Sequence, residues 1–242
     1  MSHTPTIHFC AVIKNRIGNL QRLVQSFGEM SDPSGCRFAL ADYCSNDGVI
    51  QDILTKLPMP RTVVTLGAAT FNRSQGLNYA SQHAVVSPPD IVFFIDVDML
   101  VPKNFPQMIR SNVVAGQAWF PICYSLHRNK PPVVHKNTKK VNLGNGWWRK
   151  EGKGMCGFIY RDFLSIGQWN ERFGMTYGRE DGQIARDAAK RIKLVRDRCD
   201  GLFHVWHPGG DFKTKFHKRP PQGQPAIPVP EPQVSVWRSD DA

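Results

Sequence analysis

The chain has 242 residues, of which 41% are hydrophobic, enough to bury a core in one large domain or two small ones. Its 31 basic and 20 acidic residues leave a formal charge of +11, which favours anionic partners: nucleotide-sugars, acidic glycans or an anionic membrane surface. We find no nucleic-acid-binding motif and no apolar run near the ~18 residues that cross a bilayer, so neither class of protein is indicated.

The first part of the chain alternates apolar runs with helical patterns. Continuous apolar runs are typical of strands buried on both faces, whereas apolar residues spaced by three and four predict helices. This alternation predicts an α/β fold with a mostly parallel central sheet, in which ligands gather at the carboxyl ends of the strands. We predict strands over 7–13, 37–43, 61–67 and 91–98, and helices within 14–30, 49–57 and 74–86.

The rest of the chain is less regular. One strand is predicted over 118–127, a long polar stretch follows, and residues 155–169 carry a strand and a short helix. A helix is predicted over 180–192, with short strands at 193–197 and 201–206. From Pro208 onward, recurring prolines predict no regular packing, so we divide the chain into a domain over 1–210 and a basic, proline-rich, extended tail over 211–242.

An aspartate pair, Asp96 and Asp98, closes the apolar run that begins at residue 91. Alternation along a strand would point both carboxylates the same way, and paired hard oxygen ligands suit Mn²⁺ or Mg²⁺ bridging a diphosphate. A tripeptide of this kind is common by chance, and the alternative is a helix N-cap. The strand-end position favours the metal site.

A second acidic pair, Glu180 and Asp181, opens a helix after a glycine-containing turn. Carboxylates are common at helix N-termini, so capping is the alternative. A transferase needs a base that accepts a proton from the attacking hydroxyl. We predict that Asp181 is this base and that Glu180 holds the acceptor.

Two histidines and two tryptophans complete the candidate residues. His204 and His207 lie on or just past a strand, where a spacing of three would put them on opposite faces, so we expect one to complete the aspartate site, with His207 preferred. A structural zinc site has no CxxC support. Trp147 and Trp148 lie in a polar loop that could close over a sugar donor, unless one is in the core and the other at the surface.

The ordered series of motifs resembles the catalytic domain of chondroitin N-acetylgalactosaminyltransferases, in the β-1,4-galactosyltransferase (family 7) group. The similarity covers roughly residues 7–210 and is carried by the segments FFIDVDM, FPICYSLH, GWWRKEGKGM, YRDFLSIGQWNERF, GREDGQIARD and GLFHVWH. It implies a GT-A fold, Rossmann-like in how it binds nucleotide-sugars, with inverting chemistry, Mn²⁺ as cofactor, a UDP-sugar donor and a glycan acceptor.

The resemblance also implies roles for residues. Asp98 is similar to the metal aspartate of the family, with His207 or His204 as the metal histidine, and Asp181 and Glu180 resemble the base and the acceptor-binding glutamate. The residues implied in donor binding are Arg16, Asp47, Phe71, Arg73, Asp96 and Trp148.

The sequence departs from the family in places. WGGED of the family is YGRED here, so Arg179 adds positive charge beside the acceptor and would suit an acidic glycan. The membrane anchor and stem of the family have no counterpart, and the opening residues MSHTPT are not typical of a signal peptide. We therefore expect a cytoplasmic enzyme with reduced cysteines, able to touch a membrane only peripherally.

Two other functions fit parts of the pattern. A sugar nucleotidyltransferase also uses strand-end aspartates, but it needs a nucleoside triphosphate and has no use for a tryptophan lid. A non-catalytic carbohydrate-binding module on the same scaffold would have no need of intact acidic pairs at both places. The sequence therefore favours an inverting transferase that moves a hexose or N-acetylhexosamine from a UDP-sugar to a glycan hydroxyl.

Overall fold

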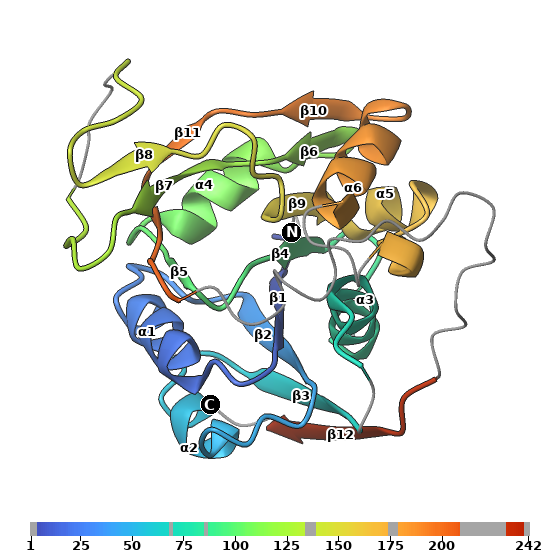
Figure 1. Ribbon diagram of the computed structural model, residues 1–242. Helices are drawn as coiled ribbons and strands as arrows, with labels where there is room; N and C mark the ends of the chain where they lie inside the picture. Colours follow the sequence, from blue (N-terminus) through green and yellow to red (C-terminus); the bar gives the residue numbers. More distant parts are fainter. Residues whose placement is uncertain are drawn as a thin grey trace, which may run out of the picture.

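The computed structural model describes residues 4–67, 70–84, 87–133, 139–173, 179–208 and 231–239. A large, mostly parallel sheet runs through the molecule, and a smaller sheet extends it at one side (Figure 1). The α/β architecture predicted from the alternation of strands and helices is confirmed.

Within the described residues the larger sheet has eight strands in the order β10-β6-β9-β4-β1-β2-β3-β12. Its centre, β4-β1-β2-β3, is parallel, whereas β9 and β12 run antiparallel to their neighbours. The strands are β1 (Ile7–Ile13), β2 (Cys36–Asp42), β3 (Arg61–Leu66), β4 (Ile91–Phe94), β6 (Gln117–Trp119), β9 (Cys156–Ile159), β10 (Lys193–Val195) and β12 (Val234–Ser239).

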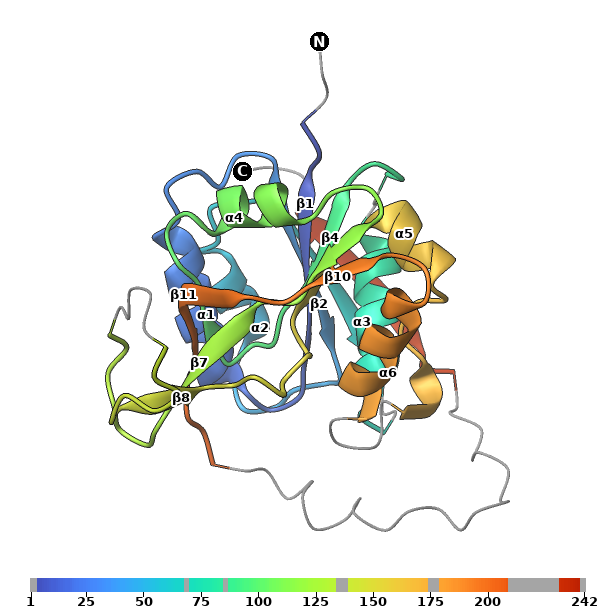
Figure 2. The same ribbon diagram turned by 90° about the horizontal axis from the view of Figure 1, so that it is seen from above.

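Helices of the described part of the chain cover both faces of this sheet (Figure 2). One face carries α1 (Ile17–Gly28), α2 (Ile50–Leu54) and α4 (Phe105–Asn112). The other carries α3 (Arg73–His83), α5 (Tyr160–Ser165) and α6 (Arg179–Ala189), with a short 3-10 helix at Glu171–Phe173. None of the described helices has the length and apolar character needed to cross a membrane.

Strand β1 shows why the sheet is apolar on both sides. Phe9 and Ala11 point into the core beneath α1, while Cys10 and Val12 point into the core beneath α3. Successive side chains of a strand face opposite ways, so a strand covered on both faces needs an uninterrupted apolar run. Burying each large side chain contributes about 1.5–3 kcal/mol, and this burial holds the helices on the sheet.

The smaller sheet has the strand order β5-β11-β7-β8 within the described residues. Its strands are β5 (Met99–Leu100), β7 (Ile122–Leu126), β8 (Gly146–Trp148) and β11 (Arg198–His204). Strand β5 follows β4 after a short turn and pairs antiparallel with β11. The turn between the two sheets therefore lies beside the end of β11.

The single strand predicted over 118–127 is wrong. The structure divides this segment into β6 of the larger sheet and β7 of the smaller sheet. Pro121 lies at the division, and a proline cannot donate a ladder hydrogen bond within a continuous strand. The chain thereby passes from one sheet to the other.

The prediction that the tail forms no regular structure is wrong for its last described segment. Strand β12 pairs antiparallel with β3 along its whole length, from Val234↔Leu66 to Ser239↔Arg61. Alternating β-branched residues in β12 fit a pleated strand, and β3 would otherwise leave unpaired backbone groups at the sheet edge. Residues 209–230 lie outside the described residues, so the domain boundary at 210 stays a prediction.

Candidate active site

The carboxyl ends of the parallel strands bring the predicted polar residues to one edge of the sheet. The loops after β1 and β2 are joined there, since the Asn15 backbone N–H donates to Ser45 Oγ at 3.0 Å. Asp96 and Asp98 lie beside them in the turn after β4. The N-terminus of α6 approaches the same edge, because Arg73 at the start of α3 contacts both Asp96 and Asp181.

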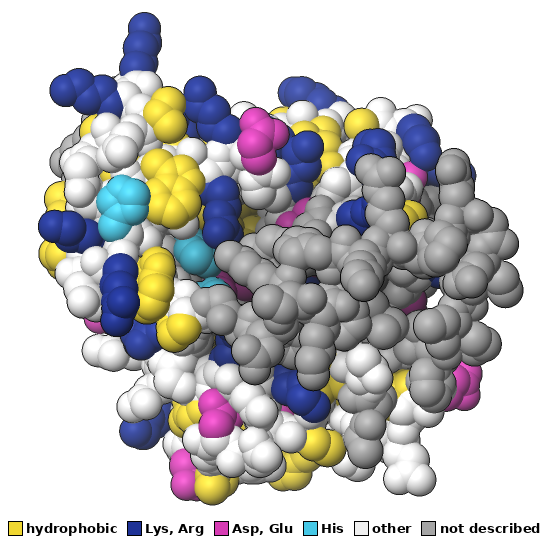
Figure 3. All heavy atoms as spheres, viewed as in Figure 1, with side chains coloured by type: hydrophobic (Ala, Val, Ile, Leu, Met, Phe, Trp, Pro, Cys, Tyr) yellow, Lys and Arg dark blue, Asp and Glu magenta, His cyan; other side chains and the backbone are white. Residues whose placement is uncertain are grey.

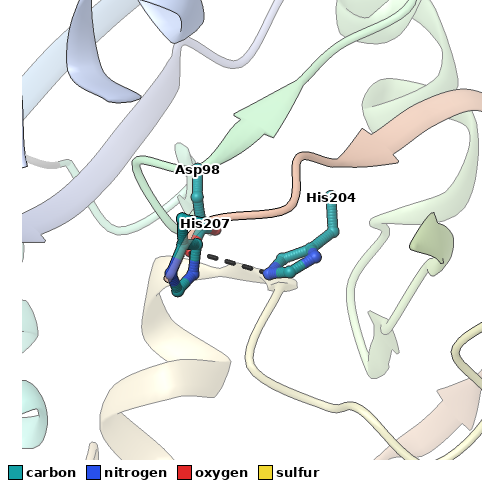
Figure 4. Close-up of side chains that lie close together, drawn as sticks. All are labelled: Asp98, His204 and His207. Carbon is teal, nitrogen blue, oxygen red and sulfur yellow. Dashed lines mark ion pairs between the residues drawn. The ribbon is translucent and has the colours of Figure 1, made fainter. Parts of the chain in front are cut away.

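Pairing between β5 and β11 assembles a cluster of three possible metal ligands. Asp98 directly precedes β5, in which Met99 pairs with His204, and the Asp98 carbonyl accepts from the Val205 N–H at 2.9 Å. One ligand atom each from Asp98, His204 and His207 lies within 4.8 Å of the others. Figure 4 shows the three side chains converging. Within the described residues, no other group of this kind was found.

The surroundings of Asp98 favour its ionised form. Burial opposes its ionisation, yet the hydrogen bond with His207 and the charges of His204, His207 and Arg16 lower its pKa to about 2. Its Oδ2 lies 2.8 Å from His207 Nε2 and 3.7 Å from His204 Nε2. Its Oδ1 is buried and has no partner among the described residues. A buried carboxylate oxygen without a donor, beside two imidazoles, suits a divalent cation.

The prediction that His204 and His207 point to opposite faces of a strand is wrong, because both lie near Asp98. Which of them would ligate a metal stays a prediction. Strand β11 ends at His204, so the alternation of side chains along a strand does not fix the direction of His207. The rings of His204 and His207 both approach Asp98, and their centroids lie 5.5 Å apart. Ser125 of β7, which the sequence analysis did not single out, lies 2.9 Å from His204 Nδ1 through its Oγ. This contact leaves Nε2 of His204 facing the carboxylate. Burial lowers the pKa of His204 and so favours the neutral, ligating form.

Arg73 joins the two acidic pairs. Its guanidinium donates to Asp96 Oδ1 at 2.8 and 3.0 Å, to Asp181 Oδ1 at 3.1 Å and to the Gly154 carbonyl at 2.8 Å. These bonds use most of its five N–H donors. The structure therefore makes Arg73 a bridge between the two acidic pairs. Its direct contact with the donor nucleotide stays a prediction.

Two further residues, Trp169 and Gly154, fix this bridge. Trp169, buried at 2% exposure, lies under the Arg73 guanidinium at 5.0 Å. Gly154 packs so closely that a Cβ there would lie 3.1 Å from both Arg73 Nη2 and Asp181 Oδ2. The glycines of the GKG segment were the available signal, because glycine permits close approach of the backbone to other groups.

Asp181 and Glu180 occupy the first turn of α6 in a largely buried setting. Burial raises the pKa of Asp181; Arg73 opposes the rise and Asp96 adds to it. Burial also raises the pKa of Glu180, to about 7, with Asp181 adding to the effect against Arg73. Glu180 Oε2 is buried without a partner among the described residues. Perturbed carboxyl groups with unused acceptor capacity are typical of functional sites.

The raised pKa of Glu180 predicts a pH-dependent loss of stability. The folded state holds this proton up to about pH 7, whereas the unfolded chain releases it near pH 4.5. Stability should therefore fall as pH rises between these values, by at most about 3 kcal/mol. We expect the Glu180→Gln protein to have a higher melting temperature than the unchanged protein at pH 8, and the same melting temperature below pH 4.5.

Thermal melting of both proteins across this pH range is the measurement. Glu29→Gln is the matched control, because Glu29 is exposed and its replacement should leave the pH profile unchanged. A constant difference in melting temperature between the Glu180→Gln and unchanged proteins at every pH would contradict the prediction.

Three more of the residues expected at the nucleotide lie on the loops after β1, β2 and β3. Arg16 reaches towards Asp98, with 3.8 Å between Nη1 and Oδ2. Asp47 Oδ2 accepts from the Ile17 N–H at 3.0 Å, so it caps the start of α1. Phe71 is half-buried against Tyr43, with ring centroids 5.2 Å apart. All three border the same edge of the sheet as Asp98.

Trp148 does not fit the expected donor-binding role. Its indole is 3% exposed and packs with Tyr124 and Phe203 under the smaller sheet. Its strand neighbour Trp147 is 37% exposed. Adjacent residues of a strand face opposite ways, so burial of Trp148 leaves Trp147 at the surface. The alternative of one tryptophan in the core and one at the surface is the arrangement found.

A family model described as chondroitin N-acetylgalactosaminyltransferase matches residues 49–210, which is more than half of the chain. The chain belongs to this family. The resemblance drawn from the sequence motifs is confirmed. The match includes Asp96, Asp98, Asp181 and both histidines, whereas Arg16 and Asp47 lie before it.

Curated relatives of this transferase family agree. Chondroitin sulfate N-acetylgalactosaminyltransferase 2 of Homo sapiens is 31% identical over 157 residues, which are 60% of this chain and 28% of the relative. Chondroitin sulfate synthase 3 of Mus musculus is 26% identical over 168 residues, 66% of this chain and 18% of the relative. The chain thus matches roughly a quarter or less of the length of these relatives.

Solved structures identify the fold. TarS of S. aureus, determined with UDP-GlcNAc, superposes with a TM-score of 0.64 at 14% identity, over 87% of this chain and 61% of that one. GalNAc-T7, determined with UDP, GalNAc and Mn²⁺, gives a TM-score of 0.60 at 13% identity, over 86% and 45% of the two chains. These are GT-A glycosyltransferases, and the predicted GT-A fold of the family member is confirmed.

Proposed function

We propose that the protein is an inverting, metal-dependent glycosyltransferase that moves a hexose or N-acetylhexosamine from a UDP-sugar to a hydroxyl of a glycan. The observation that carries the proposal is the bridge through Arg73. It ties Asp181 to Asp96, which is two residues from Asp98 in the same turn. A possible metal ligand and a possible base therefore belong to one site.

The residues present fit a divalent cation, for which Mn²⁺ is the first choice and Mg²⁺ the second. Asp98, His204 and His207 would hold it, since one carboxylate with two imidazoles suits Mn²⁺ better than the all-oxygen set preferred by Mg²⁺. When bound, the cation would neutralise the charge of the leaving diphosphate. GalNAc-T7 and a mannosyltransferase from Pyrobaculum calidifontis, both of this fold, were determined with Mn²⁺.

Asp181 would act on the acceptor. Its Oδ1 is held by Arg73, and its Oδ2 accepts no hydrogen bond from the described residues. Burial raises its pKa and makes the carboxylate a stronger base. In the proposed step, Oδ2 takes the proton of the acceptor hydroxyl as the hydroxyl oxygen bonds to the anomeric carbon. The bond from that carbon to UDP breaks on the opposite side, which inverts the configuration.

Glu180 would hold the acceptor. Its unpartnered, buried Oε2 can exchange a hydrogen bond with a sugar hydroxyl, which would satisfy a group that is otherwise costly to bury. With a pKa of about 7, its carboxyl group can donate or accept near neutral pH. Exposed Arg179 begins the same helix and would suit an acidic acceptor.

A panel of UDP-sugars tested with and without Mn²⁺ decides the proposal. We expect UDP and at least one UDP-sugar to raise the melting temperature by about 5–10 °C at saturating ligand, only when the metal is present. The same sugar should be hydrolysed slowly without acceptor. Absence of both effects across the panel would refute the proposal, and pyrophosphate release from UTP and a sugar phosphate would indicate a nucleotidyltransferase.

A further inference from the structure

One face of the smaller sheet continues directly from the proposed metal cluster to the surface, through the buried Ser125. Ser125 of β7 pairs with His204 of β11 on one side and with Trp147 of β8 on the other. Residues paired across neighbouring strands project from the same face. His204, Ser125 and Trp147 therefore form a row that begins at Asp98 and ends at an exposed indole.

A second exposed indole lies next to this row. Trp206 follows His204 by two residues, is 37% exposed and has the Arg128 guanidinium 5.0 Å from its ring centre. Trp147 is likewise flanked by His127, with ring centroids 5.1 Å apart. We call Trp147, Trp206, His127 and Arg128 the indole platform. Figure 3 shows hydrophobic, basic and histidine side chains gathered on this side of the molecule.

The residues next to Trp147 in the sequence explain why its side chain is exposed to solvent. Gly146 precedes it in β8, and a Cβ at that position would collide with the Ser125 carbonyl. The glycine lets β8 approach β7 closely, and strand alternation then buries Trp148 and exposes Trp147. Burial of Trp148, Tyr124 and Phe203 on the inner face anchors the sheet. Trp147 makes no comparable contribution to the core.

We propose that the indole platform binds sugar rings of an acidic glycan chain whose end occupies the proposed transfer site. Flat indole faces stack on the C–H faces of sugar rings, while an imidazole and a guanidinium can bond hydroxyl and carboxylate or sulfate groups. The two exposed indoles, each flanked by a polar group, suit separate rings rather than a broad apolar partner. The inference rests on the proposed function, because that function makes a glycan the acceptor.

The test is calorimetric binding of a chondroitin hexasaccharide in the absence of metal and donor. We expect Trp147→Ala to weaken binding about tenfold, which corresponds to ~1.4 kcal/mol, and Trp147→Phe to keep most of the affinity. Trp237→Ala is the matched control, because Trp237 is similarly exposed (42% against 37% for Trp147) but lies on β12 at the far edge of the larger sheet. Maltohexaose, which has no acidic groups, should bind the unchanged protein more weakly.

Several outcomes would overturn the proposal: equal affinity of the Trp147→Ala and unchanged proteins, an equal loss in Trp237→Ala, or no binding of either hexasaccharide. A melting curve of each variant checks that it is folded. Failure of the proposed function would appear separately, as a lack of Mn²⁺-dependent UDP-sugar binding and hydrolysis in the unchanged protein. Hexasaccharide binding is measured in the absence of both Mn²⁺ and UDP-sugar, so it does not depend on that result.

Discussion

Asp181→Asn is expected to lower the rate of sugar transfer by roughly 10²–10⁴-fold while leaving Mn²⁺-dependent UDP binding nearly unchanged. An amide of the same shape keeps the bond from Arg73 to the Asp181 Oδ1 position but cannot take the acceptor proton. The donor side should be unaffected, because Asp98 and the two histidines form their cluster without Asp181. Single-turnover transfer with the best UDP-sugar of the panel, together with UDP calorimetry, measures both quantities.

Asp187→Asn is the control for this change. Asp187 lies further along the same helix, where it bonds Lys190 and Gln183, and has no contact with Arg73 in the structure. The same loss of charge on α6 should leave transfer within about twofold, since surface substitutions are usually small in effect. Near-normal turnover of Asp181→Asn would remove Asp181 from the role of base. An equal loss in both variants would point to the helix as a whole.

Much of the fold could be predicted because its signals are local. The apolar run of β1 and the spacing of apolar residues in α1 were visible, and the bounds of β1 match the prediction at both ends. The division at Pro121 and the docking of β12 were not predicted. Each of these two features depends on which strand, distant in the sequence, pairs with the segment. The residues that precede β12 have the sequence pattern of an irregular tail, so they gave no sign of its pairing with β3. Pairing of that kind is a tertiary property.

The site was predictable to the extent that a parallel sheet gathers strand ends. Asp96 and Asp98 follow β4, so their place at the carboxyl edge follows from topology. The contacts of Arg73 with two carboxylates could not be predicted from the topology, because a guanidinium can reach several groups. Only the packing of Trp169 and Gly154 selects the carboxylates. The joint approach of His204 and His207 also depends on where β11 ends. Strand alternation was applied to His207, which lies three residues beyond the end of β11, and this gave the wrong geometry.

Asp98→Asn is expected to abolish the metal dependence of UDP binding. The pKa of Asp98 is lowered to about 2, so its carboxylate is ionised at every pH at which the protein would be assayed. An amide at the same position is neutral and a poor ligand, and the two histidines alone should hold the cation far more weakly. We expect Mn²⁺-dependent affinity for UDP to fall by at least about 100-fold, since even residues that only orient metal ligands contribute 10–100-fold.

Calorimetry of UDP with and without Mn²⁺ separates this effect from a loss of folding. Asp98 also holds His207 at 2.8 Å, so the variant is expected to melt somewhat lower without metal, and the informative quantity is the difference that Mn²⁺ makes. Asp52→Asn, an exposed change on α2, removes the same charge and should keep the full metal response. If Mn²⁺ strengthens UDP binding equally in Asp98→Asn and the unchanged protein, the cation is held elsewhere. The shared site of Asp98 and Asp181 then loses its metal, and the proposed transfer chemistry loses its means of stabilising the departing UDP.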